Sequence, residues 1–155
     1  MLIDCSKKVG APPHTVFACV DQPEHILGWV GGIVEHAYLT ERTSTSAVGQ
    51  HFRQRLRQGK QLRTFDGEII AWEPASHFGL RIPTAAYTSE AHFRISADGP
   101  DCSTVDYSIE IALHGKRARF LAGLIRIPLG VFVRRQIGRL KTYAEKLEDQ
   151  RVHPA

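Results

Sequence analysis

Between residues 33 and 113, apolar and polar side chains alternate with a period of two, which is the pattern of strands with one buried face. The segments EAHFRIS and TVDYSIEIAL follow it, and so does SAVGQHFRQRLRQ, where His51 and three arginines form the polar face. Glycine, proline and aspartate breakers divide the region into about six antiparallel strands joined by short connections. The face of SAVGQHFRQRLRQ that we expect to be buried comprises Val48, Gln50, Phe52, Gln54 and Leu56.

The two ends of the chain have different patterns. Residues 1–10 predict a short strand, residues 12–20 a helix that begins at prolines, and DQPEHILGW a second short helix or turn. From about residue 116 to residue 149 the spacing becomes helical, with two apolar stripes that are out of phase, so we expect Pro128 and Gly130 to kink or split this helix. The stripes are Phe120, Leu124, Ile127 and Val131, then Val133, Ile137, Leu140, Ala144 and Leu147.

This order of elements predicts an α+β helix-grip fold, in which two short helices follow the first strand and a long helix ends the chain. Four stretches resemble the START-like (SRPBCC) superfamily, and within it the polyketide cyclase/dehydrase-like bacterial proteins: VGAPPHTVFACVDQPEHILGW, VGQHFRQ, GEIIAWEPASHFGLRI and RLKTYAEKLE. The resemblance covers nearly the whole chain, so we expect one START-like domain over residues 1–155.

The resemblance implies a curved antiparallel sheet of about seven strands that wraps the C-terminal helix and leaves a deep apolar cavity between them. It also implies a ligand of the kind that such proteins bind, whether lipid, sterol, hormone, polyketide or quinone, but one fold serves many functions. The segment RFLAGLIRIPLGVF departs from the simplest family pattern, and it lies where the gate of the cavity would be.

Composition narrows the class of protein. With 155 residues and 43% hydrophobic residues, the chain can bury a core without disulfides or metal. Three widely spaced cysteines favour a reducing compartment, and since neither a signal peptide nor a membrane span is evident, we expect a cytoplasmic protein.

The eight histidines lack metal-ligand spacing, so we expect no metal, and the absence of phosphate-loop, dinucleotide and nucleophile-elbow motifs predicts no cofactor. His51 and His92 fall on polar strand faces, where we expect them to be solvated. The side of the sheet on which His36 lies is ambiguous, because both faces of its strand are mixed.

Polar side chains on otherwise apolar strand faces are the best candidates for ligand contacts, because a buried amide or hydroxyl needs a hydrogen-bond partner. A neighbouring side chain or a trapped water could equally be that partner. An apolar wall is indistinguishable from an ordinary core in sequence. The polar candidates are Gln54, Tyr87, Ser89 and Tyr107. The apolar candidates are Phe52, Leu56, Phe93, Ile109, Leu124 and Val131.

Charge is distributed unevenly, although the net charge is only +4. Two acid-free basic runs suggest solvated faces, or else a surface that attracts an anionic membrane or RNA. The strand run lacks the aromatic residues of RNA-recognition surfaces, which disfavours nucleic acid. The first run contains Arg53, Arg55, Arg57, Lys60 and Arg63. The second contains Lys116, Arg117, Arg119, Arg126, Arg134, Arg135, Arg139 and Lys141.

These observations support three hypotheses for function. The leading one is a protein that carries or sequesters a lipid-like, aromatic or polyketide-like small molecule in a hydrophobic cavity. The second is a cyclase or dehydratase in which Tyr107, Tyr87 or Gln54 polarises a carbonyl, but no inward-facing acid or base identifies a catalytic residue. The third is a module whose basic surface docks on RNA or an anionic membrane. The oligomeric state is left open.

Overall fold

The alternating segments form strands and the helical segments form helices, in the order that the sequence predicts. The computed structural model describes residues 1–43 and 45–154, apart from the side chain of Arg119. The elements are β1 (Leu2–Val9), α1 (Pro13–Asp21), α2 (Pro23–Trp29), β2 (Ile33–Tyr38), β3 (His51–Gln58), β4 (Gln61–Glu73), β5 (His77–Pro83), β6 (Tyr87–Ala97), β7 (Ser103–Leu113) and α3 (Ala118–Val152).

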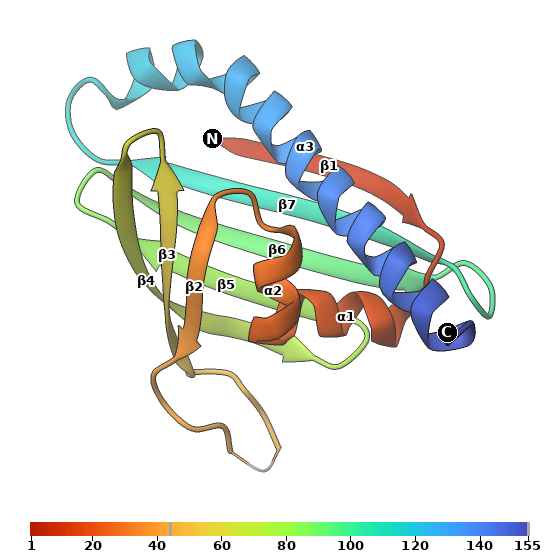
Figure 1. Cartoon of the computed structure of the whole chain (residues 1–155). Coiled ribbons are helices and arrows are strands. Elements are labelled where there is room, and N and C mark those ends of the chain that lie inside the picture. Colours follow the sequence, from red (N-terminus) through yellow and green to blue (C-terminus); the bar gives the residue numbers. More distant parts are fainter. Residues whose placement is uncertain (44, 155) are drawn as a thin grey trace.

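The seven strands form one antiparallel sheet in the order β1-β7-β6-β5-β4-β3-β2. The sheet curves, and the three helices lie on its inner face (Figure 1). This is the helix-grip architecture predicted from the order of elements. In this architecture the helices cover part of the inner face of the sheet. The rest of that face borders the space between the sheet and the helices.

The period-two pattern correctly assigns the two faces of the long strands. In β6, Ala91, Phe93 and Ile95 are buried while Arg94 is exposed. The prediction fails before β3, because that strand begins only at His51. Val48 lies in a turn and is exposed, and Gln50 is buried among polar groups rather than in the apolar core.

The C-terminal helix is not split. Pro128 lies inside one continuous helix, α3, whose first turns bend away from the direction of the rest (Figure 1). The core is reached by the second apolar stripe, which includes Ile137, Leu140 and Ala144. Phe120, from the first stripe, is 72% exposed. The two stripes are therefore out of phase because they face different surroundings.

Specific contacts fix the rotation of α3 against the rest of the protein. The Thr15 hydroxyl donates to Glu148 at 2.7 Å, and the Gly10 amide donates to Glu145 at 2.8 Å. Gly28 allows α2 to approach closely, since a Cβ there would lie 2.3 Å from the Tyr143 ring. All these contacts lie in the second half of the helix.

Two further observations concern the whole of the described chain. None of its helices is long and apolar enough to cross a membrane. Cys5, Cys19 and Cys102 are free thiols, and burial raises the pKa of Cys19 to about 12.

Candidate functional site: a cavity between the sheet and the helices

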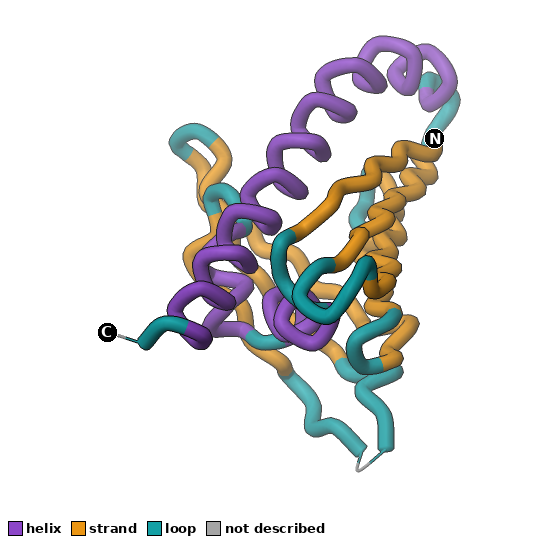
Figure 2. The backbone as a smooth tube through the Cα atoms, turned by 90° about the vertical axis from the view of Figure 1, so that its right-hand side faces the viewer, coloured by secondary structure: helices purple, strands orange, loops and turns teal. Residues whose placement is uncertain are grey.

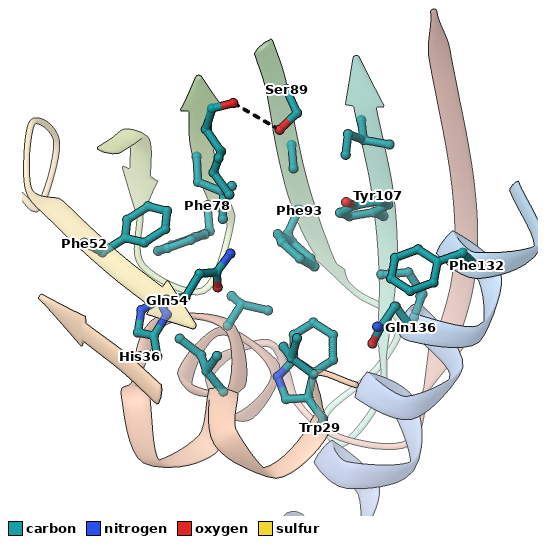
Figure 3. Close-up of a pocket in the computed structure, with 18 of the residues that line it drawn as sticks. Trp29, His36, Phe52, Gln54, Phe78, Ser89, Phe93, Tyr107, Phe132 and Gln136 are labelled. Atoms are coloured by element: carbon teal, nitrogen blue, oxygen red, sulfur yellow. Dashed lines mark hydrogen bonds between the residues drawn. The ribbon is translucent and has the colours of Figure 1, made fainter. Parts of the chain in front are cut away.

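The inner face of the sheet encloses a cavity of about 210 Å³ between β3, β5, β6 and β7 on one side and α2 and α3 on the other (Figure 3). An engineered apolar cavity of about 150 Å³ is large enough to bind benzene. The space here is therefore sufficient for an organic ligand of at least one ring.

Aromatic rings build most of the wall. Phe93 lies at its centre, with its ring centroid 4.8 Å from that of Tyr107, its cross-strand neighbour on β7. Trp29 from α2 meets Phe93 edge-on at 6.3 Å, and its indole N–H is held by the Cys19 carbonyl at 2.8 Å. Phe78 on β5 completes the group. Because these rings contact one another across four elements, the wall is formed without a ligand.

A polar corner interrupts the apolar wall where β2 pairs with β3. His36 and Gln54 are register partners there, and both line the cavity (Figure 3). The His36 ring stacks on Phe52 at 5.3 Å and meets Tyr38 edge-on at 5.2 Å. Both of its ring nitrogens are buried without a hydrogen-bond partner among the described residues.

Burial is the main influence on the charge of His36. It lowers the pKa of the imidazole, while the nearby Gln54 amide and the Asp21 carboxylate act in the opposite direction. The imidazole is therefore neutral at pH 7, with one N–H donor and one acceptor nitrogen. A buried polar group without a partner costs roughly 1 to 3 kcal/mol, so this corner favours a ligand or water that can hydrogen-bond.

Two hydroxyl groups add polar points to the wall. Ser89 on β6 is buried, and its hydroxyl donates to the Ile82 carbonyl at 3.4 Å, a long contact. Burial raises the pKa of Tyr107, so this phenol stays neutral. It is thus available as a hydrogen-bond donor.

The helix α3 closes the remaining side of the cavity. Gln136 and Phe132 both line the cavity (Figure 3). The Gln136 side chain accepts a hydrogen bond from the Gly31 amide at 3.1 Å, which joins α3 to the turn after α2. Phe132 is 53% exposed, so the cavity reaches the surface beside this ring.

The structure brings most of the candidate residues from the strands to this cavity. Those from the helix are elsewhere: Leu124 and Val131 lie on the exposed side of α3. Leu56 and Tyr87 are half-buried near the ends of their strands, outside the lining. The candidates that line the cavity are Phe52, Gln54, Ser89, Phe93, Tyr107 and Ile109.

Sequence reasoning did not identify the lining residues contributed by the helices, by β2 or by β5, among them Phe78. Trp29, Phe132 and Gln136 lie on helices whose inward sides depend on packing. His36 lay on a strand of ambiguous parity, but its strand partner Gln54 had been identified as inward-facing, and that pairing could have placed it. No spacing rule marks the others.

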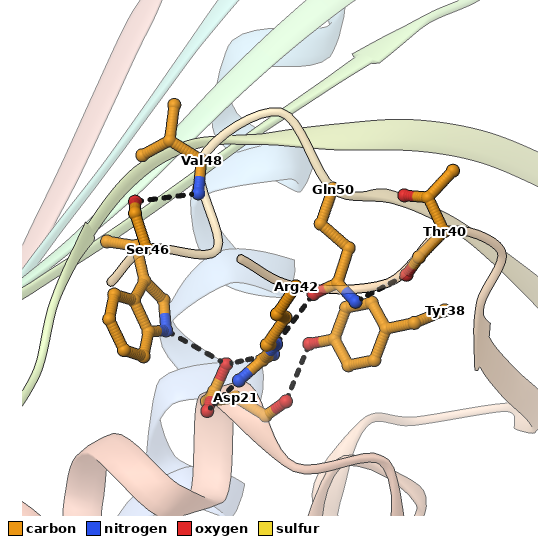
Figure 4. A network of polar contacts seen from close by, with 8 residues as sticks. Asp21, Tyr38, Thr40, Arg42, Ser46, Val48 and Gln50 are labelled. Carbon is orange, nitrogen blue, oxygen red and sulfur yellow. Dashed lines mark hydrogen bonds and ion pairs between the residues drawn. The ribbon is translucent and has the colours of Figure 1, made fainter. Parts of the chain in front are cut away.

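A second polar cluster, next to the cavity wall, is fully paired (Figure 4). Arg42 holds the buried Asp21 through two hydrogen bonds of 2.6 and 3.0 Å and also donates to Gln50 at 2.7 Å. The Tyr38 hydroxyl donates to the Asp21 carbonyl at 2.6 Å, and the guanidinium lies 4.8 Å from the Tyr38 ring centroid. Because its hydrogen bonds are used internally, this cluster ties the segment before β3 to the end of α1.

His92 is not solvated as predicted. It is half-buried, and its Nδ1 lies 2.8 Å from Nε2 of His77 on the neighbouring strand. Burial and the nearby Arg94 lower the pKa of both imidazoles, which matches a pair that shares a hydrogen bond in the neutral form. His51 is exposed, as predicted.

Acidic side chains on neighbouring strands offset part of the positive charge of the first basic run. Arg53 pairs with Asp66 on β4 at 2.7 Å, and Arg55 pairs with Glu35 on β2 at 3.4 Å. Exposed pairs of this kind contribute little stability, but they offset the positive charge of this face. This weakens the case for an RNA-binding surface on the strands.

Residues 3–145 match a protein-family model described as "Polyketide cyclase / dehydrase and lipid transport". The chain belongs to this family. No curated protein matches the chain.

Among solved structures, a START superfamily protein from Mycobacterium smegmatis is similar with a TM-score of 0.76 at 15% identity, over 94% of this chain and 98% of that one. The Zhui aromatase/cyclase from Streptomyces sp. R1128 has a TM-score of 0.72 at 10% identity, over 99% of this chain and 96% of that one. At this identity the likeness concerns the fold, and it confirms the START-like architecture.

Proposed function

We propose that the protein, as a single START-like domain of the cytoplasm, binds a small hydrophobic molecule in the cavity between the sheet and α3. The ligand is lipid-like, aromatic or polyketide-like. The observation that carries the proposal is an aromatic-walled space of about 210 Å³, with an imidazole in its wall that has no hydrogen-bond partner within residues 1–43 and 45–154. Binding sites for small molecules share this composition, with a few polar groups placed in an apolar lining.

The arrangement of the wall specifies the ligand further. One end should carry a hydroxyl or carbonyl directed at His36 and Gln54, since these are the polar side chains of the β2–β3 corner. The body should be apolar and flat enough to lie against Phe93 and Tyr107. A charged ligand group is disfavoured, because His36 and Gln54 are neutral and the nearby Asp21 carboxylate is already paired with Arg42.

Catalysis is the alternative, and one feature of the site argues against it. A general base must come within hydrogen-bond reach of the reacting proton. The described residues that line the cavity include no carboxylate, lysine or cysteine that could act together with His36, whose ring is packed between Phe52 and Tyr38. This geometry favours a residue that orients a bound molecule over one that transfers its protons.

Native mass spectrometry of gently purified protein should reveal a retained small molecule, and a solvatochromic apolar probe should bind with roughly micromolar affinity, or about 8 kcal/mol. Gln54→Trp should abolish probe binding while the circular dichroism spectrum stays intact, because the indole occupies the cavity. The matched control is Arg55→Trp, the same substitution one residue along β3 on the opposite face, which should bind the probe normally. Equal binding by the two variants, or no binding by the wild type, would refute the proposal.

The same assay tests the polar corner. Wild-type protein should prefer 1-naphthol to naphthalene by more than their difference in hydrophobicity, and His36→Phe, which keeps a ring of similar shape, should remove that preference. The unliganded variant should also be more stable by about 1 kcal/mol, since it loses a buried group without a partner. A preference that survives in His36→Phe would assign the polar contact to another residue.

A further inference from the structure

The first half of α3 exposes an apolar stripe that nothing in the described structure covers. The stripe consists of Phe120, Leu124, Ile127 and Val131, which are 72%, 62%, 78% and 37% exposed. Two views show the first turns of the helix standing apart from the strands (Figures 1 and 2). Contiguous exposed apolar surface of this kind marks an interaction site more often than isolated exposed residues do.

Positive charge accompanies the stripe. No acidic residue occurs in the sequence between Glu110 and Glu145. Arg126 and Arg134 are exposed and line, with Ile127, a groove between α3 and β1. Asp4 of β1 lies in the same groove, yet the ion pairs among the described residues include neither arginine. The charges of both arginines are therefore free to meet an external anion.

We propose that the first half of α3 docks on an anionic lipid surface, with the apolar stripe entering the boundary between headgroups and acyl chains and the arginines contacting the headgroups. A helix with an apolar face and basic neighbours binds membranes in this way, lying in the interface without crossing it. The absence of a membrane-crossing helix among the described residues is compatible with this orientation.

Charge decides between a lipid surface and a second copy of the chain. A dimer formed through the stripe would bring Arg126, Arg134 and Arg135 of both copies together without intervening acidic residues from this helix. Like charges in contact repel, whereas a surface of acidic lipids supplies the opposite charge along with an apolar layer.

The position of the stripe adds a reason for such docking. Phe132, which lines the cavity and is 53% exposed, directly follows Val131 of the stripe. A docked α3 would thus bring the mouth of the cavity close to the lipid. The docking itself does not depend on the proposed ligand binding, because it uses residues outside the cavity wall.

Cosedimentation with vesicles tests the proposal. The wild-type protein should bind vesicles of phosphatidylcholine mixed with phosphatidylserine, bind phosphatidylcholine alone at least about tenfold more weakly, and lose affinity when salt rises from about 0.1 M to about 1 M. Arg126→Glu with Arg134→Glu should weaken binding at low salt at least about tenfold. Leu124→Ser with Ile127→Ser should weaken it at both salt concentrations.

Two control pairs carry the same chemical changes elsewhere on the surface. Lys8→Glu with Lys146→Glu matches the charge change, and Leu27→Ser with Val152→Ser matches the loss of exposed apolar side chains. Both should bind like the wild type, and so should Gln54→Trp, in which the cavity is filled. Circular dichroism of each variant verifies folding.

Three results would overturn the proposal. One is a wild-type protein that does not sediment with anionic vesicles, and another is equal binding by the wild type and both α3 variants. The third is a wild-type dimer, measured by light scattering, that the double variant Leu124→Ser with Ile127→Ser dissociates, while neither the wild type nor any variant binds vesicles. The stripe would then join two copies of the chain. Gln54→Trp fills the cavity and leaves the stripe unchanged, so ligand binding and vesicle binding are tested separately. A failure of the vesicle experiment therefore leaves the cavity proposal unaffected.

Discussion

The two halves of α3 have similar apolar spacing but opposite surroundings. In residues 133–152, Leu140 and Ala144 are fully buried, and the half is anchored by Thr15 and Gly10 through Glu148 and Glu145. In residues 118–132, Ile127 is 78% exposed although it belongs to an equally regular stripe. Helical periodicity thus establishes that a segment has an apolar side, but not what that side contacts.

One helix can present only one side to the sheet, and this explains the difference. The second half contacts α1, α2 and the turn that follows β1, so its packing determines the rotation of the whole helix. The first stripe is out of phase with the second and therefore points away from the core. Packing against the protein's own core therefore does not explain the apolar character of the first half.

The largest expected contrast is in stability. Leu140→Ala should lower the free energy of unfolding by about 2 to 5 kcal/mol, since it removes buried methyl groups and leaves a void. Leu124→Ala, the same change in the exposed half, should stay within about 0.5 kcal/mol. Denaturant unfolding of the two variants measures both values. Similar losses would mean that the first half is packed as tightly as the second.

Hydrogen exchange should show the next contrast. Backbone amides of residues 133–148 should exchange at least about a hundredfold more slowly than those of residues 121–131, because exposed and weakly packed segments open locally. Pro128 adds to the effect, since it cannot donate to the helical carbonyl four residues before it. Added anionic vesicles should protect the first half selectively if it docks there. Uniform protection in the free protein would contradict the comparison.

A smaller effect concerns the anchoring of the second half. Hydrogen bonds from Arg151 and Thr15 lower the pKa of Glu148 in the folded state. As the pH falls, Glu148 therefore takes up a proton in the unfolded chain before it does so in the folded protein. The stabilisation that its carboxylate gives the folded protein is present above about pH 4.5 and is lost below it.

Glu148→Gln should thus cost about 1 kcal/mol at pH 7, and the difference from the wild type should shrink toward about pH 3. Thermal melts across this range provide the measurement. Asp149→Asn, at the exposed neighbouring position, is the control and should follow the wild-type curve. A pH-independent cost would show that the shape of the Glu148 side chain matters rather than its charge.

Strand residues of the candidate site were predictable because strand parity is a local property. Once Phe93 and Tyr107 are placed on the inner face by alternation, the curvature of the sheet brings them to the same cavity. Gln54 and Ser89 follow for the same reason. Whether such a face meets empty space or close-packed side chains depends on the helices opposite, and the sequence pattern is the same in both cases.

By itself, the sequence determined which segments are strands and helices, their order, and the two faces of the long strands, because each of these depends on residues close together in the chain. The tertiary structure decided that α3 remains one helix with its first stripe outward, and that Trp29 and Gln136 meet the sheet residues at a cavity. It also decided that His36 has no hydrogen-bond partner there in the described part of the chain. These features depend on how segments distant in the chain pack, and packing selects one side of an amphipathic helix according to the whole set of its contacts.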